Sequence, residues 1–591
     1  MRLPVLLIRL FRHVSAGRRS QFVLMLGLTM LSSVAEVVSL GAVLPFIGIL
    51  TQPEKVFAFP AVAAVARTLG IGTAAGLVLP LTAAFAAAAI AAAGLRLLLL
   101  WVSIRLANNT GADLSLEIYR RTLYQPYHVH VSRNSSEIIS GITQKAATAT
   151  SVLISLVSVM NSTVLFAAIL LTLLAIDPVV AAAAAVIFGT GYALIAWQLN
   201  RRLTRNSRFI AEEQTRVVKA LQEGLGAIRD VLLDGSQAVY CDVYRGAVRK
   251  LQRADGENAY MNQFPRYAIE ALGMVLVSAL SYTLSRRSGG IGAALPIMGA
   301  MALGAQRLLP LLQQLYGNWT VVAGSRSALI DVLGLLEQPL PEEALLPAPE
   351  PLEFHESIRF DDVRFRYGSD GHWVLDGVSL TIAKGARVGF VGGTGSGKST
   401  ALDLLMILLE PTQGRILVDG RPITGELRRA WQRAIAHVPQ GIFLADASIA
   451  ENIAFGVPME QIDMARVRQA AVQAQIAEFV EGRPGGYGAW VGERGIRLSG
   501  GQRQRIGIAR ALYKKATVLV FDEATSALDS ETENEVMGAI ESLSQDMTIL
   551  IVAHRLTTLK HCGEVVQLER GRMVSQGTYE QFARDGFKGT A

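Results

Sequence analysis

The sequence contains little charge for its length. Of its 591 residues only 18% are Asp, Glu, Lys or Arg, whereas 51% are hydrophobic, and the mean hydropathy is +0.34. Disordered chains are poor in apolar residues, and ordinary soluble domains are about 25% charged. The composition therefore excludes both classes. Long uncharged runs end near Thr320 and normal charge density begins near Glu337, so we expect a membrane protein with a large aqueous domain.

Cysteine is almost absent. Cys241 and Cys562 lie far apart in segments that we expect to be cytosolic. Disulfides are rare in reducing compartments, so we expect two unreactive thiols and no redox chemistry.

The chain also carries an excess of positive charge. Its net charge is +7 and its pI is about 9.4, a balance that is sometimes typical of nucleic-acid binding. Here the basic residues concentrate beside apolar segments, so we expect a membrane as the partner and no nucleic acid.

Six apolar segments approach or exceed the ~20 residues that a helix needs to cross a bilayer. They are residues 22–50, 69–104, 146–176, 179–199, 267–285 and 291 to about 322. Residues 53–68 predict a short helix on the membrane surface, and both long loops predict helical continuations of their spans. The transmembrane domain would then comprise residues 1–337.

Arginine and lysine predict the orientation of these spans. Basic residues are dense before the first span, between the second and third, and between the fourth and fifth, and the Arg286-Arg287 pair is the exception. We therefore expect a multi-pass protein of a bacterial-type inner membrane. Its N-terminus, long loops and C-terminal half would be cytoplasmic.

The C-terminal half predicts an α/β domain. Residues 338–356, rich in Pro and Glu, predict a linker. From residue 357 to 591, short apolar strands at 387–391, 518–521 and 548–552 alternate with helical stretches. This alternation is typical of a largely parallel sheet.

A phosphate-binding loop follows the strand at 387–391 and opens a helix. Its residues are Gly392, Gly393, Thr394, Gly395, Ser396, Gly397, Lys398, Ser399 and Thr400. Backbone N–H groups would surround the phosphates of ATP, Lys398 would reach the β and γ phosphates, and Ser399 would ligate Mg²⁺. A chance glycine-rich turn is the alternative, which the strand-loop-helix context disfavours.

An acidic pair ends the strand at 518–521. Asp522 would hold the Mg²⁺ shell, and Glu523 would take a proton from the attacking water. Such a pair alone is weak evidence, but beside a phosphate-binding loop it indicates nucleotide hydrolysis.

A third group of motifs resembles the nucleotide-binding domain of ATP-binding-cassette proteins over essentially all of residues 357–591. It comprises Ser499, Gly500, Gly501 and Gln502 before a basic helix, Gln440 in VPQ, residues 526–529 (SALD) ending in Asp529, and His554. The resemblance implies head-to-tail dimers in which each ATP lies between one phosphate-binding loop and the partner's 499–501 segment. It also implies that Tyr367 stacks on adenine, Gln440 senses Mg²⁺ and His554 contacts the γ-phosphate. A plain core role is the alternative for Tyr367 and for His554.

Six spans followed by the cassette domain resemble an exporter-type half-transporter. Because Glu523, Ser499 and His554 are all present, we expect a homodimer. The membrane half is similar to bacterial flippases of polyprenyl-pyrophosphate-linked oligosaccharides, which makes such a lipid-linked glycan the expected substrate. One alternative is an exporter of lipid A, peptide or hydrophobic drugs, although no N-terminal peptidase-like domain accompanies the spans. The other is a cassette ATPase without transport, which the six spans disfavour.

Three arginines fall in the inner half of the predicted membrane region. At 1.5 Å per residue Arg96 lies about 35 Å below Thr73, Arg266 about 29 Å below Ser285, and Arg307 about 24 Å below Ile291. Charges there are costly unless they face a cavity or a partner, so we expect a basic belt that grips a pyrophosphate. Otherwise Arg96 and Arg266 would extend to the cytoplasmic interface, or Arg307 would pair with Glu36 or Glu270.

Overall fold

The computed structural model of the chain comprises two compact units. One contains Met1–Gln125 and His130–Leu340, and the other contains Pro126–Val129 and Pro341–Ala591. The structure describes residues 3–41, 54, 73, 76, 78–176, 178–285, 308–368, 371–522, 537–538, 546–552, 559–560 and 562–585.

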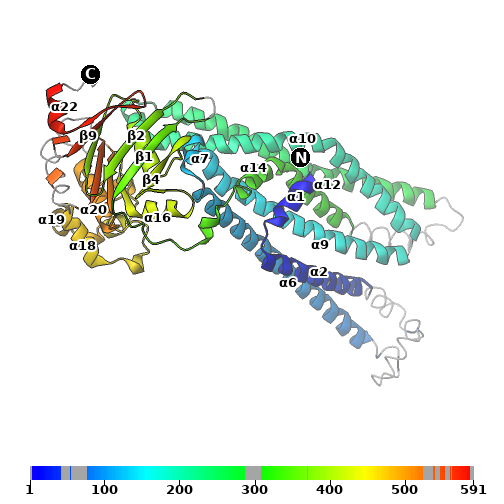
Figure 1. Cartoon of the computed structure of the whole chain (residues 1–591). Helices are drawn as coiled ribbons and strands as arrows, with labels where there is room; N and C mark the ends of the chain where they lie inside the picture. The colour runs from blue at the N-terminus through cyan, green and yellow to red at the C-terminus, as the bar shows by residue number, and fades with distance from the viewer. Residues whose placement is uncertain are drawn as a thin grey trace. The chain divides into compact units, whose positions relative to one another are not determined.

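The described part of the first unit is helical (Figure 1). Long apolar segments without internal breakers form single helices, and α9 has the bounds predicted for the third span. The helices are α1 (Leu3–Arg12), α2 (Ala16–Gly41), α6 (Val78–Leu123), α7 (Tyr127–Ser132, which begins in the second unit), α8 (Ser135–Ser140), the π-helix η2 (Gly141–Lys145), α9 (Ala146–Ile176), α10 (Pro178–Gly226), α11 (Ile228–Leu233), α12 (Gln237–Ser285), a helix at Leu308–Gly324, and α14 (Arg326–Leu336).

Among the described residues, three helices are long and apolar enough to cross a membrane, at Ala16–Ser39, Val78–Leu123 and Ser135–Thr172. A fourth is the pair Leu308–Gly324 and Arg326–Leu336, bent by 56°. The first, second, third and sixth predicted spans thus coincide in part with membrane-compatible helices. The fourth and fifth predicted spans form the first part of α10 and the last part of α12 and remain predictions.

The helical continuations predicted for the long loops are present. Helix α6 runs on to Leu123, α10 to Gly226, and α12 begins at Gln237, well before its predicted span. Helices α10 and α12 lie side by side, as do α2 and α6 (Figure 1). The surface helix predicted at residues 53–68 lies outside the described residues, apart from Glu54.

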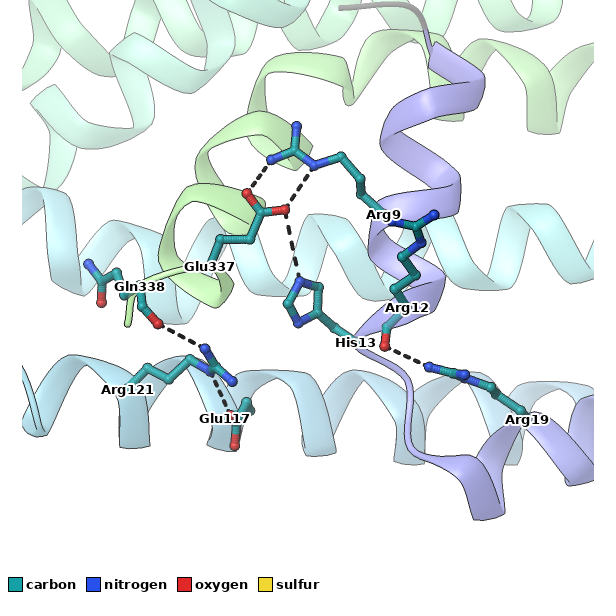
Figure 2. A network of polar contacts seen from close by, with 8 residues as sticks. All are labelled: Arg9, Arg12, His13, Arg19, Glu117, Arg121, Glu337 and Gln338. Carbon is teal, nitrogen blue, oxygen red and sulfur yellow. Dashed lines mark hydrogen bonds and ion pairs between the residues drawn. The ribbon is translucent and has the colours of Figure 1, made fainter. Parts of the chain in front are cut away.

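A polar network attaches α1 to the segment that follows α14 (Figure 2). Arg9 holds the Glu337 carboxylate with two nitrogens, its Nε lying 2.8 Å from Oε1. Arg121 donates from Nη1 to the carbonyl oxygen of Gln338 at 2.8 Å and pairs through Nε with Glu117 at 2.6 Å. The end of the membrane unit is therefore tied both to the N-terminal helix and to α6.

The second unit contains two sheets. Its strands are β1 (Ser357–Phe365), β2 (Leu375–Ala383), β3 (Arg387–Val391), β4 (Gln413–Val418), β5 (Arg421–Pro422), β6 (Ile435–Val438), β7 (Val518–Asp522), β8 (Thr548–Val552), β9 (Glu564–Glu569) and β10 (Arg572–Gly577). The larger sheet has the order β10-β9-β3-β8-β7-β6 and is parallel except for β10. The predicted largely parallel sheet is this one.

The smaller sheet, β2-β1-β4-β5, is antiparallel and was not predicted. Strands β1 and β2 largely alternate buried residues with exposed or half-buried ones, β4 buries only its last three residues, and β5 is exposed. Such half-buried strands have a weaker apolar signal than the continuous runs of the parallel sheet.

Helices complete the second unit. They are α15 (Lys398–Leu405), α16 (Glu426–Ala434), α17 (Ile449–Ile453), α18 (Met464–Gln473), α19 (Ala477–Glu481), α20 (Gly500–Tyr513) and α22 (Tyr579–Asp585). Trp431 of α16 is fully buried and donates its indole N–H to the carbonyl oxygen of Leu405 at 2.8 Å. This contact holds the end of α15, the helix that carries the phosphate-binding loop.

The two cysteines are free thiols, with Cys241 exposed and Cys562 buried. Burial raises the pKa of the Cys562 thiol to about 12, so it stays protonated at neutral pH.

Candidate functional site

The phosphate-binding loop lies between β3 and α15, as the sequence predicts. Strand β3 is central in the larger sheet, with β8 on one side and β9 on the other, and its last four residues are buried. A rigid, buried strand therefore fixes the start of the loop. The N-terminus of α15 fixes its end and directs backbone N–H groups toward the loop, an arrangement that favours an anion.

Two glycines of the loop have no room for a side chain. Gly392 has φ +148°, and a Cβ there would lie 2.1 Å from the carbonyl oxygen of Leu568. Gly397 has φ +101°, and a Cβ would lie 2.6 Å from a methyl carbon of Leu375. The glycines thus serve the close packing of the loop as well as its approach to phosphate.

Lys398 opens α15 and is 6% exposed. Its Nζ donates to the carbonyl oxygens of Gly392 at 2.8 Å and Gly393 at 3.1 Å, so the ammonium group lies inside the curve of the loop. Thr400 is buried, whereas Ser399, Thr394 and Gly395 are exposed. The ammonium group and the Ser399 hydroxyl are both at the helix start, where the phosphates of a nucleotide would lie.

Asp522 and Gln440 lie at the carboxyl edge of the same sheet. Asp522 ends β7 in register with Val552 of β8, and Gln440 follows β6, whose Val438 pairs with Phe521. Carboxyl ends of parallel strands are the usual ligand-binding edge of such sheets. The fold therefore brings both residues to the edge from which the phosphate-binding loop also starts.

Asp403, one turn into α15, is a site residue that the sequence reasoning missed. Burial, and next the negative charge of Asp522, raise its pKa to about 6. An acidic residue within the apolar stretch STALDLLMILL was the available signal. Negative charge is thus concentrated beside the loop, which favours a bound cation.

Ser499 caps α20. Its hydroxyl accepts a hydrogen bond from the N–H of Gln502 at 3.2 Å, and the Gln502 side chain accepts one from the N–H of Ser499 at 2.9 Å. This reciprocal capping box leaves Ser499 and Gly500 exposed at the start of a 14-residue helix, while Gly501 is buried. The predicted second anion site therefore has the required helix N-terminus.

Tyr367 lies just after β1 and is 54% exposed, with its ring 4.9 Å from that of Phe365 in an edge-to-face arrangement. A plain core role is therefore wrong, and the adenine role remains a prediction. Glu523, Asp529 and His554 lie outside the described residues, and their roles also remain predictions.

The expected arginine belt has partners within the chain. Arg96 of α6 lies 2.8 Å from the carboxylate of Glu36 of α2, and Arg266 lies 2.8 Å from that of Glu270, one turn along α12. The carboxylates that were considered for Arg307 are therefore engaged by Arg96 and Arg266. Arg307 itself lies outside the described residues. Two of the three positive charges are compensated, which weakens the case for a pyrophosphate grip.

The donor groups at this edge of the sheet fit Mg²⁺. Ser399, Asp522 and Gln440 provide hydroxyl, carboxylate and amide oxygens, the hard ligands that Mg²⁺ prefers. Among the described residues no group of three or more His, Cys, Asp or Glu side chains could hold a metal. Mg²⁺ usually relies on one or two carboxylates, water and substrate phosphates.

Known proteins share these features. The family model described as "ABC transporter" matches residues 375–526. The ATP-dependent lipid A-core flippase of Cupriavidus metallidurans is 36% identical over 393 residues, 65% of this chain and 64% of the relative. The protein of that name from Cupriavidus pinatubonensis is 30% identical over 487 residues, 80% of each chain. The chain thus spans slightly less than two thirds of the first relative.

The fold has a solved counterpart. The structure of a bacterial Atm1-family ABC exporter with ATP bound superposes with a TM-score of 0.77 at 26% identity and covers 97% of both chains. A likeness that extends over nearly the whole chain includes the membrane half and the cassette domain together. The chain belongs to the ABC transporter family and has the fold of an exporter-type half-transporter.

Proposed function

We propose that the chain is an ATP-driven exporter that moves a lipid of the lipid A type from the inner to the outer leaflet. The observation that carries the proposal is the alignment with the C. pinatubonensis lipid A-core flippase over 487 residues. That alignment is about twice as long as the cassette region 357–591, so much of it falls on the membrane half, where substrate is handled.

A polyprenyl-pyrophosphate oligosaccharide is the less favoured substrate. The physical argument for it was a belt of three positive charges, but Glu36 and Glu270 neutralise Arg96 and Arg266. A carboxylate already in contact with a guanidinium competes with phosphate for the same N–H donors. The lipid A alternative agrees with the names of the relatives.

In the proposed cycle, ATP binds at the phosphate-binding loop of one copy of the chain and at the Ser499–Gly501 segment of a second copy. Lys398 and the start of α15 would hold the phosphates, Tyr367 would stack on the adenine, and Ser399, Asp522 and Gln440 would hold Mg²⁺. When bound, Mg²⁺ supplies neutralisation of phosphate charge. Glu523 accepts the proton of the attacking water, and His554 contacts the γ-phosphate.

This proposal includes a homodimer in a bacterial inner membrane with its cassette domains in the cytoplasm. Two copies of the chain would supply two composite ATP sites, because each Ser499–Gly501 segment serves the partner's phosphate-binding loop. Closure of the two domains on ATP would then drive the membrane helices between inward and outward openings.

Stimulation of ATP hydrolysis by substrate tests the proposal. The full chain is reconstituted in nanodiscs, and its ATPase rate is measured with added lipid A or with a polyprenyl-pyrophosphate oligosaccharide. The proposal expects stimulation by lipid A and little by the oligosaccharide, with both responses absent in the Lys398→Ala variant. Stimulation by the oligosaccharide alone would refute the lipid A assignment.

A further inference from the structure

Helices α10 and α12, the two long paired helices of the membrane unit, lie side by side (Figure 1). A cavity of about 740 Å³ lies between them, and an adjoining cavity of about 460 Å³ is lined by α12 alone; Tyr260 and Phe264 line both, and together the two cavities form a groove. The larger cavity also contacts Arg202 and Arg205 of α10, and the smaller one continues along α12 to Tyr267. One end of the groove is therefore basic and the other aromatic.

The positive charge at the basic end is uncompensated. Arg202 and Arg205 are exposed, and within the described ranges neither lies in an ion pair. The acidic residue that lines this cavity, Glu257, is already engaged by Arg253 at 3.6 Å and by the amide of Asn206 at 3.2 Å. Because Arg202 and Arg205 are three residues apart, their side chains share one face of α10.

The aromatic end is apolar and open. The rings of Tyr260 and Phe264 stack with centroids 5.6 Å apart and an interplanar angle of 14°. Tyr260 is 69% and Tyr267 65% exposed, although large aromatic surfaces are usually covered. Arg266 lies near Tyr267 but is paired with Glu270, so it adds no free charge.

The depth of the groove matches the headgroups of the cytoplasmic leaflet. The predicted fourth span ends at Leu199, so Arg202 and Arg205 lie about 4.5 and 9 Å beyond it along the helix axis. The headgroup region is about 5–8 Å thick on each side of the hydrocarbon core. Tyr267 begins the predicted fifth span, and tyrosines are enriched at this boundary. By the same rule Phe264 lies about 4.5 Å and Tyr260 about 10.5 Å outside the start of that span. The basic end, with Tyr260, is thus at or just beyond phosphate level, and the groove reaches the acyl chains at Phe264 and Tyr267.

We propose that this groove binds one anionic phospholipid of the cytoplasmic leaflet, with its phosphate on Arg202 and Arg205 beside Tyr260 and an acyl chain that passes Phe264 and Tyr267 into the membrane. Two guanidinium groups on one helix face provide donors for a single phosphate. A phospholipid with one phosphate suits this arrangement, whereas a larger headgroup with separated phosphates would need a second basic cluster. The site is independent of which lipid the protein transports.

Native mass spectrometry of the purified full chain with added phosphatidylglycerol or phosphatidylcholine tests the site by measuring how tightly each lipid binds. The first phosphatidylglycerol should bind each chain more tightly than phosphatidylcholine, and Arg202→Gln with Arg205→Gln should weaken that binding about tenfold or more. The matched control is Arg201→Gln with Arg249→Gln, which removes the same charge. Arg201 is exposed at nearly the same depth but does not line the groove, and Arg249 is exposed farther from the membrane. The control should bind like the wild type.

Several outcomes would overturn the site. One is equal binding of the two lipids, and another is an equal loss in the Gln pair and in its control, since either would mean unspecific charge attraction. Displacement of phosphatidylglycerol from the wild type by equimolar lipid A would assign the groove to the transported lipid. If Arg202→Gln with Arg205→Gln dissociates the dimers while lipid binding stays unchanged, the groove is a contact between subunits. Arg202→Lys with Arg205→Lys should retain part of the preference, because charge remains without the planar donor geometry.

Discussion

Arg96 and Glu36 form an ion pair of 2.8 Å between α6 and α2, with the carboxylate 5% and the guanidinium side chain 48% exposed. Both helices are among those that can cross a membrane. A charge in such a position is expensive unless it has a partner, and here each charge is the other's partner. The pair therefore ties two spans together, and Arg96 does not present a free charge to a substrate.

Replacing Arg96 alone should destabilise the protein. Arg96→Met removes the guanidinium that pairs with the buried Glu36 carboxylate, which should cost about 3 kcal/mol, and the double variant Arg96→Met, Glu36→Leu should recover most of that loss. Thermal unfolding in detergent measures both. As a control, Arg105→Met on the same helix removes only a contact with the Trp101 ring and should cost less than about 1 kcal/mol. Additive losses in the double variant would show that the pair has no stabilising coupling.

Acid should weaken the attachment of α1 to the end of the membrane unit (Figure 2). Burial and the charge of Arg121 lower the pKa of His13 below its ordinary value. They outweigh the negative charges of Glu337 and Glu117, which raise this pKa; the Glu337 carboxylate lies 3.9 Å from the His13 ring. The unfolded chain therefore binds this proton more readily, and stability is lost as the pH falls through about 6.5.

Hydrogen exchange of the α1 amides at pH 7.5 and 5.5, corrected for the slower intrinsic exchange in acid, should show lower protection factors at the lower pH. His13→Asn should reduce that difference. Higher protection factors at pH 5.5 would mean that the pairing of protonated His13 with Glu337 dominates.

The ionised carboxylate of Asp403 should lower the free energy of unfolding at neutral pH. Its pKa of about 6 exceeds the ordinary 3.8, so the folded state keeps a proton that the unfolded chain releases. Stability should therefore fall as the pH rises from about 4 to 6 and stay lower above that range. Because Asp403 is only partly buried, Asp403→Asn should add about 1 kcal/mol at pH 7.5 without Mg²⁺ and little at pH 4.5. Calorimetry can compare it with Asp446→Asn, an exposed position that should show no gain at either pH.

Composite ATP sites can be tested with mixed dimers. If Ser499 acts on the ATP held by the partner, a dimer with Ser499→Arg in one chain and Lys398→Ala in the other keeps one intact site. The Lys398→Ala homodimer keeps none. ATP hydrolysis by the mixed species should be about half that of the wild type or less, but clearly above that of the homodimer. Equal rates for the two would argue against head-to-tail sharing.

Local motifs made the nucleotide site predictable. The loop at Gly392–Lys398, the strand that ends at Asp522 and the cap at Ser499 each depend on residues close in sequence, and the structure places all three as expected. Continuous apolar runs likewise predicted β3, β8 and α9 with their observed bounds.

Contacts between distant segments were not predictable. The Arg96–Glu36 pair joins residues sixty positions apart, and a single sequence does not indicate which carboxylate approaches which arginine. The raised pKa of Asp403 depends on Asp522, more than a hundred residues away. The antiparallel sheet was missed because its strands bury only part of their residues and so lack the continuous apolar runs that mark β3, β7 and β8.

Lipid translocation in proteoliposomes tests the central claim most directly. The full chain is reconstituted with fluorescent lipid A-core or with a fluorescent polyprenyl-pyrophosphate oligosaccharide, and outward movement is followed by quenching after addition of Mg²⁺ and ATP. The account predicts ATP-dependent movement of lipid A-core. It also predicts a loss of about a hundredfold or more in Glu523→Gln, which keeps ATP binding but lacks the proposed base. Movement of the oligosaccharide alone, or lipid A-core movement at the wild-type rate in Glu523→Gln, would contradict it.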